Sequence, residues 1–250
     1  MLCNLCNTNH EKLCKAHLIP ESFYRFMYPD SKIVGTPLRI VLHDSEHAHK
    51  SVIGLYDNNI LCSNCDNFLG KLDDYGKEIL LDKEPEKVYA NSGNEIFSIN
   101  NVDIKKLSLF FLSVLWRCSI SKRKELSEVC IGKKFENKIR DLLFLDKETV
   151  DDFSIVITRY RYLNDNYKKL LFLPKPLKIE GLNYYNVYFP NGYKILIKVD
   201  RRPQLRELEA LTLKVGKQTH VICYDWFDNS DEYEKTSLKV KAIGGNAIRK

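Results

Sequence analysis

Two Cys-x2-Cys pairs limit what this chain can fold into more than any other part of its sequence. Cys3 and Cys6 stand near the start, and Cys62 and Cys65 follow after a long intervening segment. A two-residue gap lets both sulfurs of one turn face a single ion, and two such turns complete a tetrahedral site of four thiolates. The spacing therefore predicts one structural Zn²⁺ ion held by these four cysteines.

Other metal-binding side chains leave this ligand set partly open. Three of them are alternatives for any one of the four ligands: His10, Cys14 and His17. The remaining cysteines stand in apolar stretches and are predicted to be core residues: Cys118, Cys130 and Cys223.

Composition bears on location and partners. The 250-residue chain has eight cysteines, and it shows neither a signal-peptide pattern nor an apolar run near the roughly 18 residues that a membrane span needs. We therefore expect a cytoplasmic protein with reduced thiols and no membrane association. The formal net charge of +6 permits a polyanionic partner without requiring one.

Hydrophobic periodicity predicts an α+β fold in two parts. Residues 1–95 are expected to form an N-terminal zinc module, in which a helix begins after Cys62. Residues 96–250 are expected to form an α+β domain, with helices within 103–145 packed on a largely antiparallel sheet. Asp103 is the expected N-cap of the first of these helices. The charged, turn-prone segment 82–95 is the expected boundary between the two parts.

The second helix is expected at 133–145, and short apolar runs then mark the expected strands. Those of the second part are at 153–160, 169–173, 184–189, 193–199 and 220–223, and the first part has two more, at 33–42 and 51–56. Pro190-Asn191-Gly192 is a hairpin signal between two of the strands. Arg117 lies inside the apolar helix and is expected to pair with an acid of the N-terminal module.

Two segments resemble a known family. They are Lys15-Ala16-His17-Leu18-Ile19-Pro20 and the run from Asn59 through Leu61-Cys62-Ser63-Asn64-Cys65-Asp66. With the first cysteine pair they resemble the HNH endonucleases, in the zinc-stabilised branch of that family, over about residues 1–75. The resemblance implies a treble-clef zinc module of the ββα-metal type that cuts phosphodiester bonds.

The resemblance also implies roles for individual residues. His17 matches the general base, and Asn59, or Asn58, matches the Asn that orients it. Asp66 stands where the family has a metal-binding His, which is a departure, but a carboxylate is a good ligand for Mg²⁺ or Mn²⁺. A catalytic divalent ion is therefore expected at His17 and Asp66. The structural alternatives are a capping or zinc-ligating His17, a helix-terminus carboxylate at Asp66, and an ordinary turn at the two asparagines.

Clusters of basic residues suggest a nucleic-acid surface. Lys122, Arg123 and Lys124 follow the main helix, and Lys133 and Lys134 begin the next. Such side chains suit phosphate contacts, although a solvated helix face explains them equally well.

The wider layout, including Leu115-Trp116-Arg117-Cys118-Ser119, resembles HNH-type proteins of bacterial anti-phage defence systems. This resemblance implies a nuclease effector that works beside an ATPase or another defence-system protein. The sequence thus favours a metal-dependent endonuclease acting on DNA, or RNA. The alternatives are a catalytically inert zinc-finger module that binds nucleic acid or a partner protein, and a protein whose zinc only supports the fold.

Overall fold

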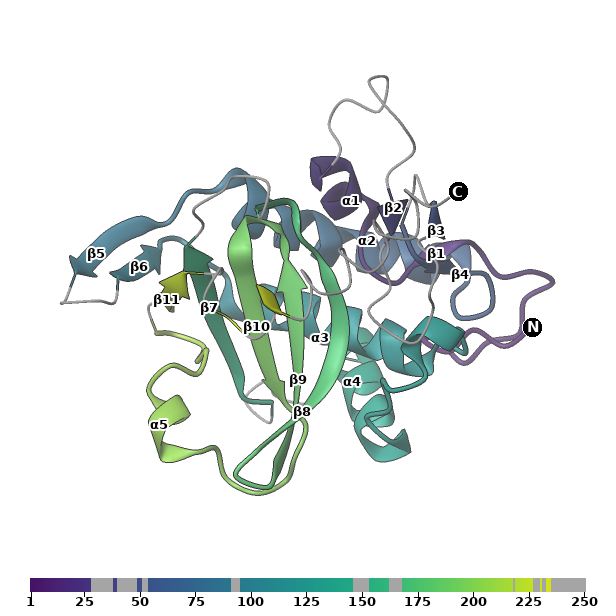
Figure 1. Cartoon of the computed structure of the whole chain (residues 1–250). Coiled ribbons are helices and arrows are strands. Elements are labelled where there is room, and N and C mark those ends of the chain that lie inside the picture. Colours follow the sequence, from purple (N-terminus) through teal and green to yellow (C-terminus); the bar gives the residue numbers. More distant parts are fainter. Residues whose placement is uncertain are drawn as a thin grey trace.

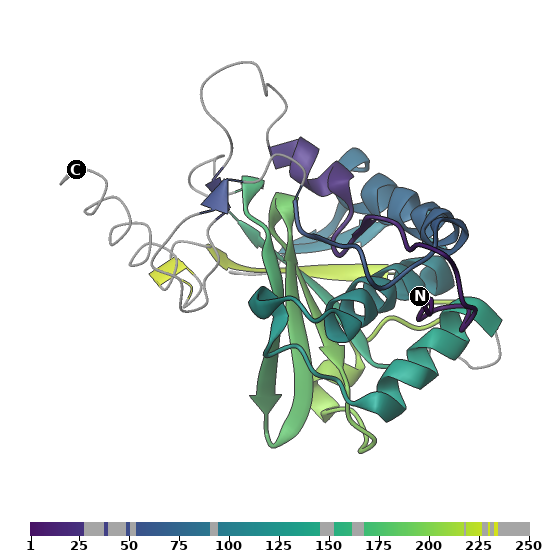
Figure 2. The ribbon, with the colours of Figure 1, turned by 90° about the vertical axis from the view of Figure 1, so that its right-hand side faces the viewer.

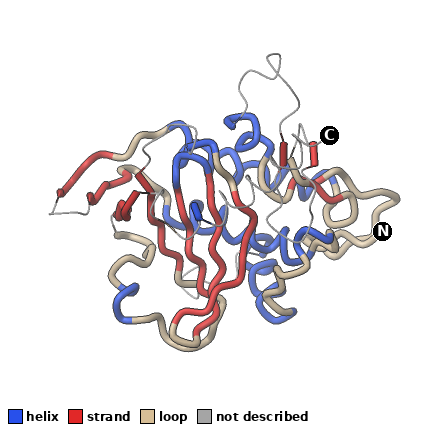
Figure 3. The backbone as a smooth tube through the Cα atoms, in the orientation of Figure 1, coloured by secondary structure: helices blue, strands red, loops and turns tan. Residues whose placement is uncertain are grey.

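A computed structural model shows a layer of helices packed on one large sheet (Figures 1 and 3). The structure describes residues 1–27, 38–39, 49–50, 54–90, 95–145, 153–161, 168–217, 219–226, 230 and 233–234. Among the helices within these ranges, none is long and apolar enough to span a bilayer. The mixed helix and sheet content confirms the α+β class.

The large sheet has seven strands in the order β5-β6-β11-β7-β10-β9-β8. Their bounds are β5 Glu86–Ala90, β6 Glu95–Ile99, β7 Ile155–Arg161, β8 Phe172–Ile179, β9 Leu182–Phe189, β10 Tyr193–Lys198 and β11 Thr219–Trp226. Every neighbouring pair is antiparallel except β11 and β7, which are parallel. β9 and β10 pair through the short η5 turn, Pro190–Gly192, which confirms the expected hairpin.

All the α-helices except the last and shortest gather on one face of this sheet, as the turned view shows (Figure 2). Their bounds are α1 Glu21–Met27, α2 Ser63–Lys77, α3 Ile104–Ile120, α4 Lys133–Leu145 and α5 Arg206–Glu209, with short helical turns η1 Glu78–Asp82 and η2 Lys124–Leu126. The Asp103 side chain accepts a hydrogen bond from the Lys106 N–H, so it caps α3 as expected. Two small two-stranded sheets complete the fold: β1 Ala16–His17 with β4 Tyr56–Asp57, and β2 Leu38–Arg39 with β3 His49–Lys50.

Edge position explains two strands that the apolar runs of the sequence did not fully indicate. β5 forms within the segment 82–95, because charged residues such as Glu86 and Lys87 are tolerated on an edge strand. β8 runs on past the expected end at residue 173 through two prolines, which only an edge strand accepts readily. The strands expected at 33–42 and 51–56 fall largely outside the described residues.

One continuous apolar core joins the parts of the chain before and after residue 95. At its centre, Phe23 of α1 contacts Phe110 of α3 and Phe189 of β9, with ring centroids 5.8 and 4.9 Å away. The Asn191 side chain donates to the Leu80 carbonyl over 3.1 Å and so links η5 to η1. These contacts fix α2 and its surroundings against the large sheet, while the division into 1–95 and 96–250 stays a prediction.

The packing of α2 on α3 depends on Gly76. A Cβ at this position would lie 2.5 Å from the ring of Phe110, which is fully buried. We expect Gly76→Ala to lower the free energy of unfolding by about 1–3 kcal/mol, because the ring has no space into which to move. Gly70→Ala is the matched control on the same helix, since its Cβ would meet nothing within 4 Å. That variant should be neutral or stabilised by up to about 1 kcal/mol. Urea unfolding measures both, and equal effects would contradict this packing.

Candidate metal centre and hairpin site

The four paired cysteines converge on one point beside the start of α2. The sulfur atoms of Cys3, Cys6, Cys62 and Cys65 all lie within 4.8 Å of one another. Four thiolates around one Zn²⁺ ion are separated by about 3.8 Å, given a Zn–S distance of about 2.3 Å, so a small adjustment closes the site. These cysteines therefore lie close enough to hold a metal ion.

Backbone hydrogen bonds build this cluster. The first pair sits in a tight turn, where the Asn7 N–H donates to the Cys3 carbonyl over 3.0 Å and Asn7 has a positive φ of 56°. The Asn4 N–H donates to the Ile60 carbonyl over 2.9 Å, which places the first turn against the second. The Cys62 N–H then donates to the Cys3 sulfur over 3.3 Å, an arrangement that favours the thiolate form.

Burial shifts the protonation of the thiols in this cluster. It raises the pKa of the thiols of Cys3 and Cys65 above the ordinary value. At Cys6, burial is outweighed by hydrogen bonds from His10 and Thr8, and the pKa falls to about 6. Buried thiolates without a counter-charge are unfavourable, so the donor set fits a bound metal ion.

The alternative ligands take other positions. The Cys14 thiol donates to the Leu61 carbonyl, and His10 Nε2 lies 3.7 Å from the Cys6 sulfur, so His10 contacts a ligand. Within the described ranges, no further group of three or more His, Cys, Asp or Glu side chains brings its donor atoms together in this way. Cys118 is buried as expected, but Cys130 is exposed, so the prediction that it is a core residue was wrong. The side chain of Cys223 is outside the described part of the chain.

β1 and β4 form an antiparallel hairpin that has a long insertion between its two strands. This β1–β4 hairpin presents two different faces. Ala16 pairs with Asp57, and both side chains are buried. His17 pairs with Tyr56, and both are half-buried. Because side chains alternate along a strand, Lys15 shares the face of His17, and Lys15 is exposed. The hairpin therefore has an inner face that packs on the core and an outer face that carries His17.

His17 is held from three sides. Its Nε2 atom lies 3.9 Å from a carboxylate oxygen of Glu21, the first residue of α1. Its ring meets that of Tyr56 edge-on, with centroids 6.4 Å apart. Its backbone carbonyl accepts a hydrogen bond over 3.0 Å from Arg117 of α3. The side chain of His17 is 22% exposed, so solvent can reach the imidazole.

A buried arginine connects this hairpin to α2. The Arg117 side chain is 1% exposed and pairs with both carboxylate oxygens of Asp73, at 2.9 and 2.6 Å. This confirms the expected pairing with an acid of the N-terminal module. Burial lowers the pKa of Arg117, but the Asp73 carboxylate outweighs it and raises the pKa, so the guanidinium remains charged.

Asp66 lies in the first turn of α2, directly after Cys65 of the second cysteine pair. Burial raises the pKa of its carboxyl above the ordinary value; Arg117 and His17 act in the opposite direction, and Asp73 reinforces the increase. Asp66 therefore interacts electrostatically with His17, Asp73 and Arg117. A carboxyl whose pKa is shifted by burial and by neighbouring charges is the kind of group that functional sites contain.

Asn59 occupies a turn. Its backbone N–H donates to Asp57 over 2.8 Å, and the side chains of Asn58 and Asn59 are both exposed. The second carboxylate oxygen of Asp57 accepts from the Ser121 hydroxyl over 2.6 Å. This is the turn geometry that sequence reasoning offered as the alternative for the two asparagines. An orienting role for Asn59 stays a prediction.

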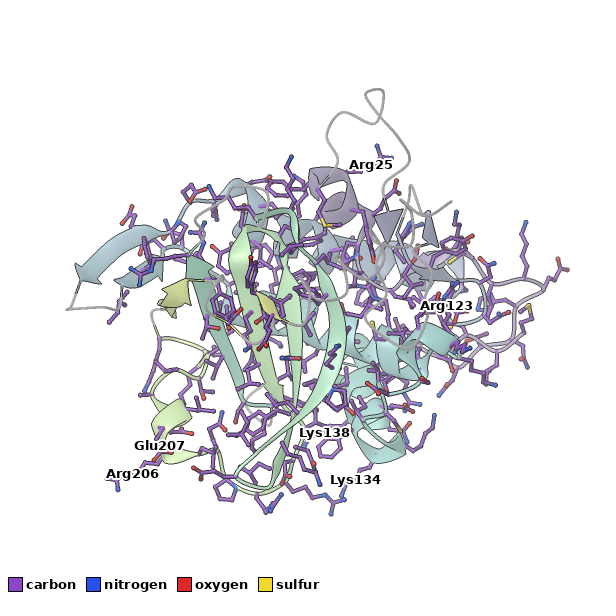
Figure 4. All side chains as sticks on the ribbon, in the orientation of Figure 1. Arg25, Arg123, Lys134, Lys138, Arg206 and Glu207 are labelled. Carbon is purple, nitrogen blue, oxygen red and sulfur yellow. The ribbon has the colours of Figure 1, made fainter. Side chains whose placement is uncertain are left out.

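The basic residues fall in two separate places. Figure 4 shows Arg123 on the side of the molecule that carries the β1–β4 hairpin, and Lys134 near α4 away from it. Lys122 and Lys124 flank Arg123 and are exposed. Lys133 is exposed and lies 3.5 Å from Glu136. Only the cluster at 122–124 therefore adjoins the hairpin.

Sequence reasoning missed several parts of this site. Glu21 and Tyr56 were not expected beside His17, and neither was the pairing of Ser121 with Asp57. The sequence does place Tyr56 in a predicted strand before Cys62. The residues around Tyr56, however, do not indicate that His17 is its cross-strand partner.

Comparison of the chain with models of protein families, with curated proteins and with solved structures finds no match.

Proposed function

We propose that this protein is a metal-dependent endonuclease of the HNH type that hydrolyses phosphodiester bonds of DNA. The observation that carries the proposal is the placement of His17. It stands half-buried on the outer face of the β1–β4 hairpin, next to Glu21, and it interacts electrostatically with Asp66 on α2. A cysteine turn, then a hairpin, then a helix is also the order expected of a treble clef, and this agreement supports the proposal.

Zinc is the metal proposed for the four cysteines. Four sulfur donors in a closed, largely buried arrangement are typical of a structural zinc site. The Cys62 N–H donates to a ligand sulfur, which is the outer-shell contact that orients such sites. The ion would hold the first cysteine turn against the start of α2, and thereby fix where Asp66 lies.

His17 and Asp66 divide the catalytic work in this proposal. His17 in its neutral form accepts the proton of the water that attacks phosphorus. Asp66 would hold Mg²⁺ or Mn²⁺ beside His17, and the bound ion would neutralise charge on the phosphate and the leaving oxygen. One protein carboxylate suffices, because Mg²⁺ usually retains several waters and takes further oxygens from the substrate phosphates. Arg117 holds the backbone of His17 in place through its hydrogen bond to the carbonyl.

The test is cleavage of plasmid and linear DNA by the purified protein with added Mn²⁺ or Mg²⁺. We expect wild type to cut, and His17→Ala to lose at least about 100-fold in rate, because general-base catalysis contributes that much or more. Zinc content and the thermal midpoint show that the variant is folded.

Equal cutting by wild type and His17→Ala would contradict the assignment. Binding without cutting by both would support instead an inert zinc module. If a defence-system partner is required, cutting will appear only when an ATPase partner is added, and His17→Ala must still abolish it.

A further inference from the structure

The outer face of the hairpin carries more than His17. Lys15 lies two residues before His17 on the same face, and its Nζ atom lies 3.9 Å from the centroid of the Tyr56 ring. Tyr56 is the cross-strand partner of His17. Lys15 and Tyr56 therefore form one surface with the proposed general base, and neither was assigned a role from the sequence.

A second cation reaches Tyr56 from the segment after α3. The Arg123 guanidinium carbon lies 5.9 Å from the Tyr56 ring centroid, and its Nη1 donates to the Tyr56 carbonyl over 2.9 Å. Glu125 also accepts from Arg123 over 2.9 Å and fixes its orientation. Two cations therefore contact Tyr56: Lys15, which precedes it in the chain, and Arg123, which follows it.

The two cations differ in how far their charge is already neutralised by a carboxylate of the protein. Arg123 shares its charge with Glu125, at 2.9 Å. Lys15 is exposed, and its ammonium group lies over the π face of Tyr56 rather than against a carboxylate of the described residues. Cation–π contacts at exposed sites are weak, of about 0.5–1 kcal/mol, so the Lys15 ammonium is available to a phosphate at little cost.

We propose that Lys15, Tyr56 and Arg123 form the surface that binds the phosphodiester backbone of nucleic acid beside His17. Lys15 and Arg123 contact phosphates, and the Tyr56 ring positions both cations. This inference rests on the proposed function, which it deepens by locating the substrate. The proposal also distinguishes between the two basic clusters. The basic residues near Arg123 bind nucleic acid, whereas Lys134 does not belong to this surface.

The experiment measures binding separately from cleavage. A short fluorescein-labelled DNA duplex, and its single strand, are titrated with protein in buffer without added Mg²⁺ or Mn²⁺, and anisotropy is followed at several salt concentrations. We expect Lys15→Ala to weaken binding about three- to ten-fold and to reduce the slope of log affinity against log salt by about 1, because one phosphate contact is lost.

Two controls make the readout specific. Lys217→Ala removes the same charge from an exposed site in the segment between α5 and β11, two elements that Figure 1 shows far from β1 and β4, and should bind as wild type. Tyr56→Phe retains the ring and should also bind as wild type, whereas Tyr56→Leu should weaken binding at least about three-fold. If the variants show these binding effects but the wild type does not cut DNA, the proposed binding surface is supported and the proposed nuclease activity is not. Unchanged binding by Lys15→Ala and Tyr56→Leu would overturn the surface, even if wild type cuts DNA.

Discussion

Replacing Cys62 with serine is expected to remove the zinc and to destabilise the whole chain. Cys62 stands at the N-terminus of α2, and its backbone N–H also bonds to the Cys3 sulfur. Structural zinc contributes on the order of 10 kcal/mol to small zinc modules, and the loss of one thiolate forfeits much of that. A loss of roughly 5 kcal/mol in a chain of this size lowers the thermal midpoint by about 10–20 °C.

The effect should extend beyond the first residues, because the cysteines belong to the continuous core. Cys3, Cys62 and Cys65 are buried in the same cluster as Leu69 and the α3 side chains. The matched control is Cys130→Ser, which makes the same chemical change at an exposed thiol and should leave zinc content and midpoint unchanged. Zinc content by mass spectrometry, with thermal unfolding, decides this. A full complement of zinc in Cys62→Ser would show that another residue is the ligand.

Replacing Arg117 with methionine is expected to cost about 3–5 kcal/mol of unfolding free energy. The change leaves the Asp73 carboxylate, which is 15% exposed, without its bidentate partner, and it removes the hydrogen bond from Arg117 to the His17 carbonyl. Removing one member of a buried ion pair is costly because the remaining charge is buried uncompensated. The surface pair of Arg140 and Asp141 provides the control, and Arg140→Met should cost about 1 kcal/mol or less.

A double-mutant cycle isolates the interaction from the loss of packing. Arg117→Met combined with Asp73→Leu removes both charges, so it should recover a large part of the stability lost in Arg117→Met alone. If the two single changes simply add in urea unfolding, the pair contributes nothing and α2 is held on α3 by apolar contacts such as Gly76 on Phe110.

Local sequence patterns correctly predicted those elements whose structure depends on residues close together in the chain. The helices α3 and α4 appeared where apolar residues recur at three- and four-residue steps, and Asp103 caps α3 as expected. The cysteine pairs came together because two turns and a helix start determine their geometry. The turn at residues 190–192 joined β9 to β10 for the same reason.

Long-range pairing could not be predicted in this way. β11 lies between β6 and β7, segments distant from it in the chain, and no residue of β11 specifies its neighbours. The acid that pairs with Arg117 was expected but not identified, because several acids of α2 were equally available until the helix was placed against α3. Tyr56 and Lys15 meet only through the register of the hairpin.

The most direct test is anomalous X-ray scattering from crystals grown with Mn²⁺. We expect a zinc signal among the sulfurs of Cys3, Cys6, Cys62 and Cys65, and a separate manganese signal next to His17 and Asp66. A zinc signal at His17 would contradict the account, because a zinc-ligating imidazole cannot serve as the general base. So would the absence of manganese beside Asp66 in protein that cleaves DNA.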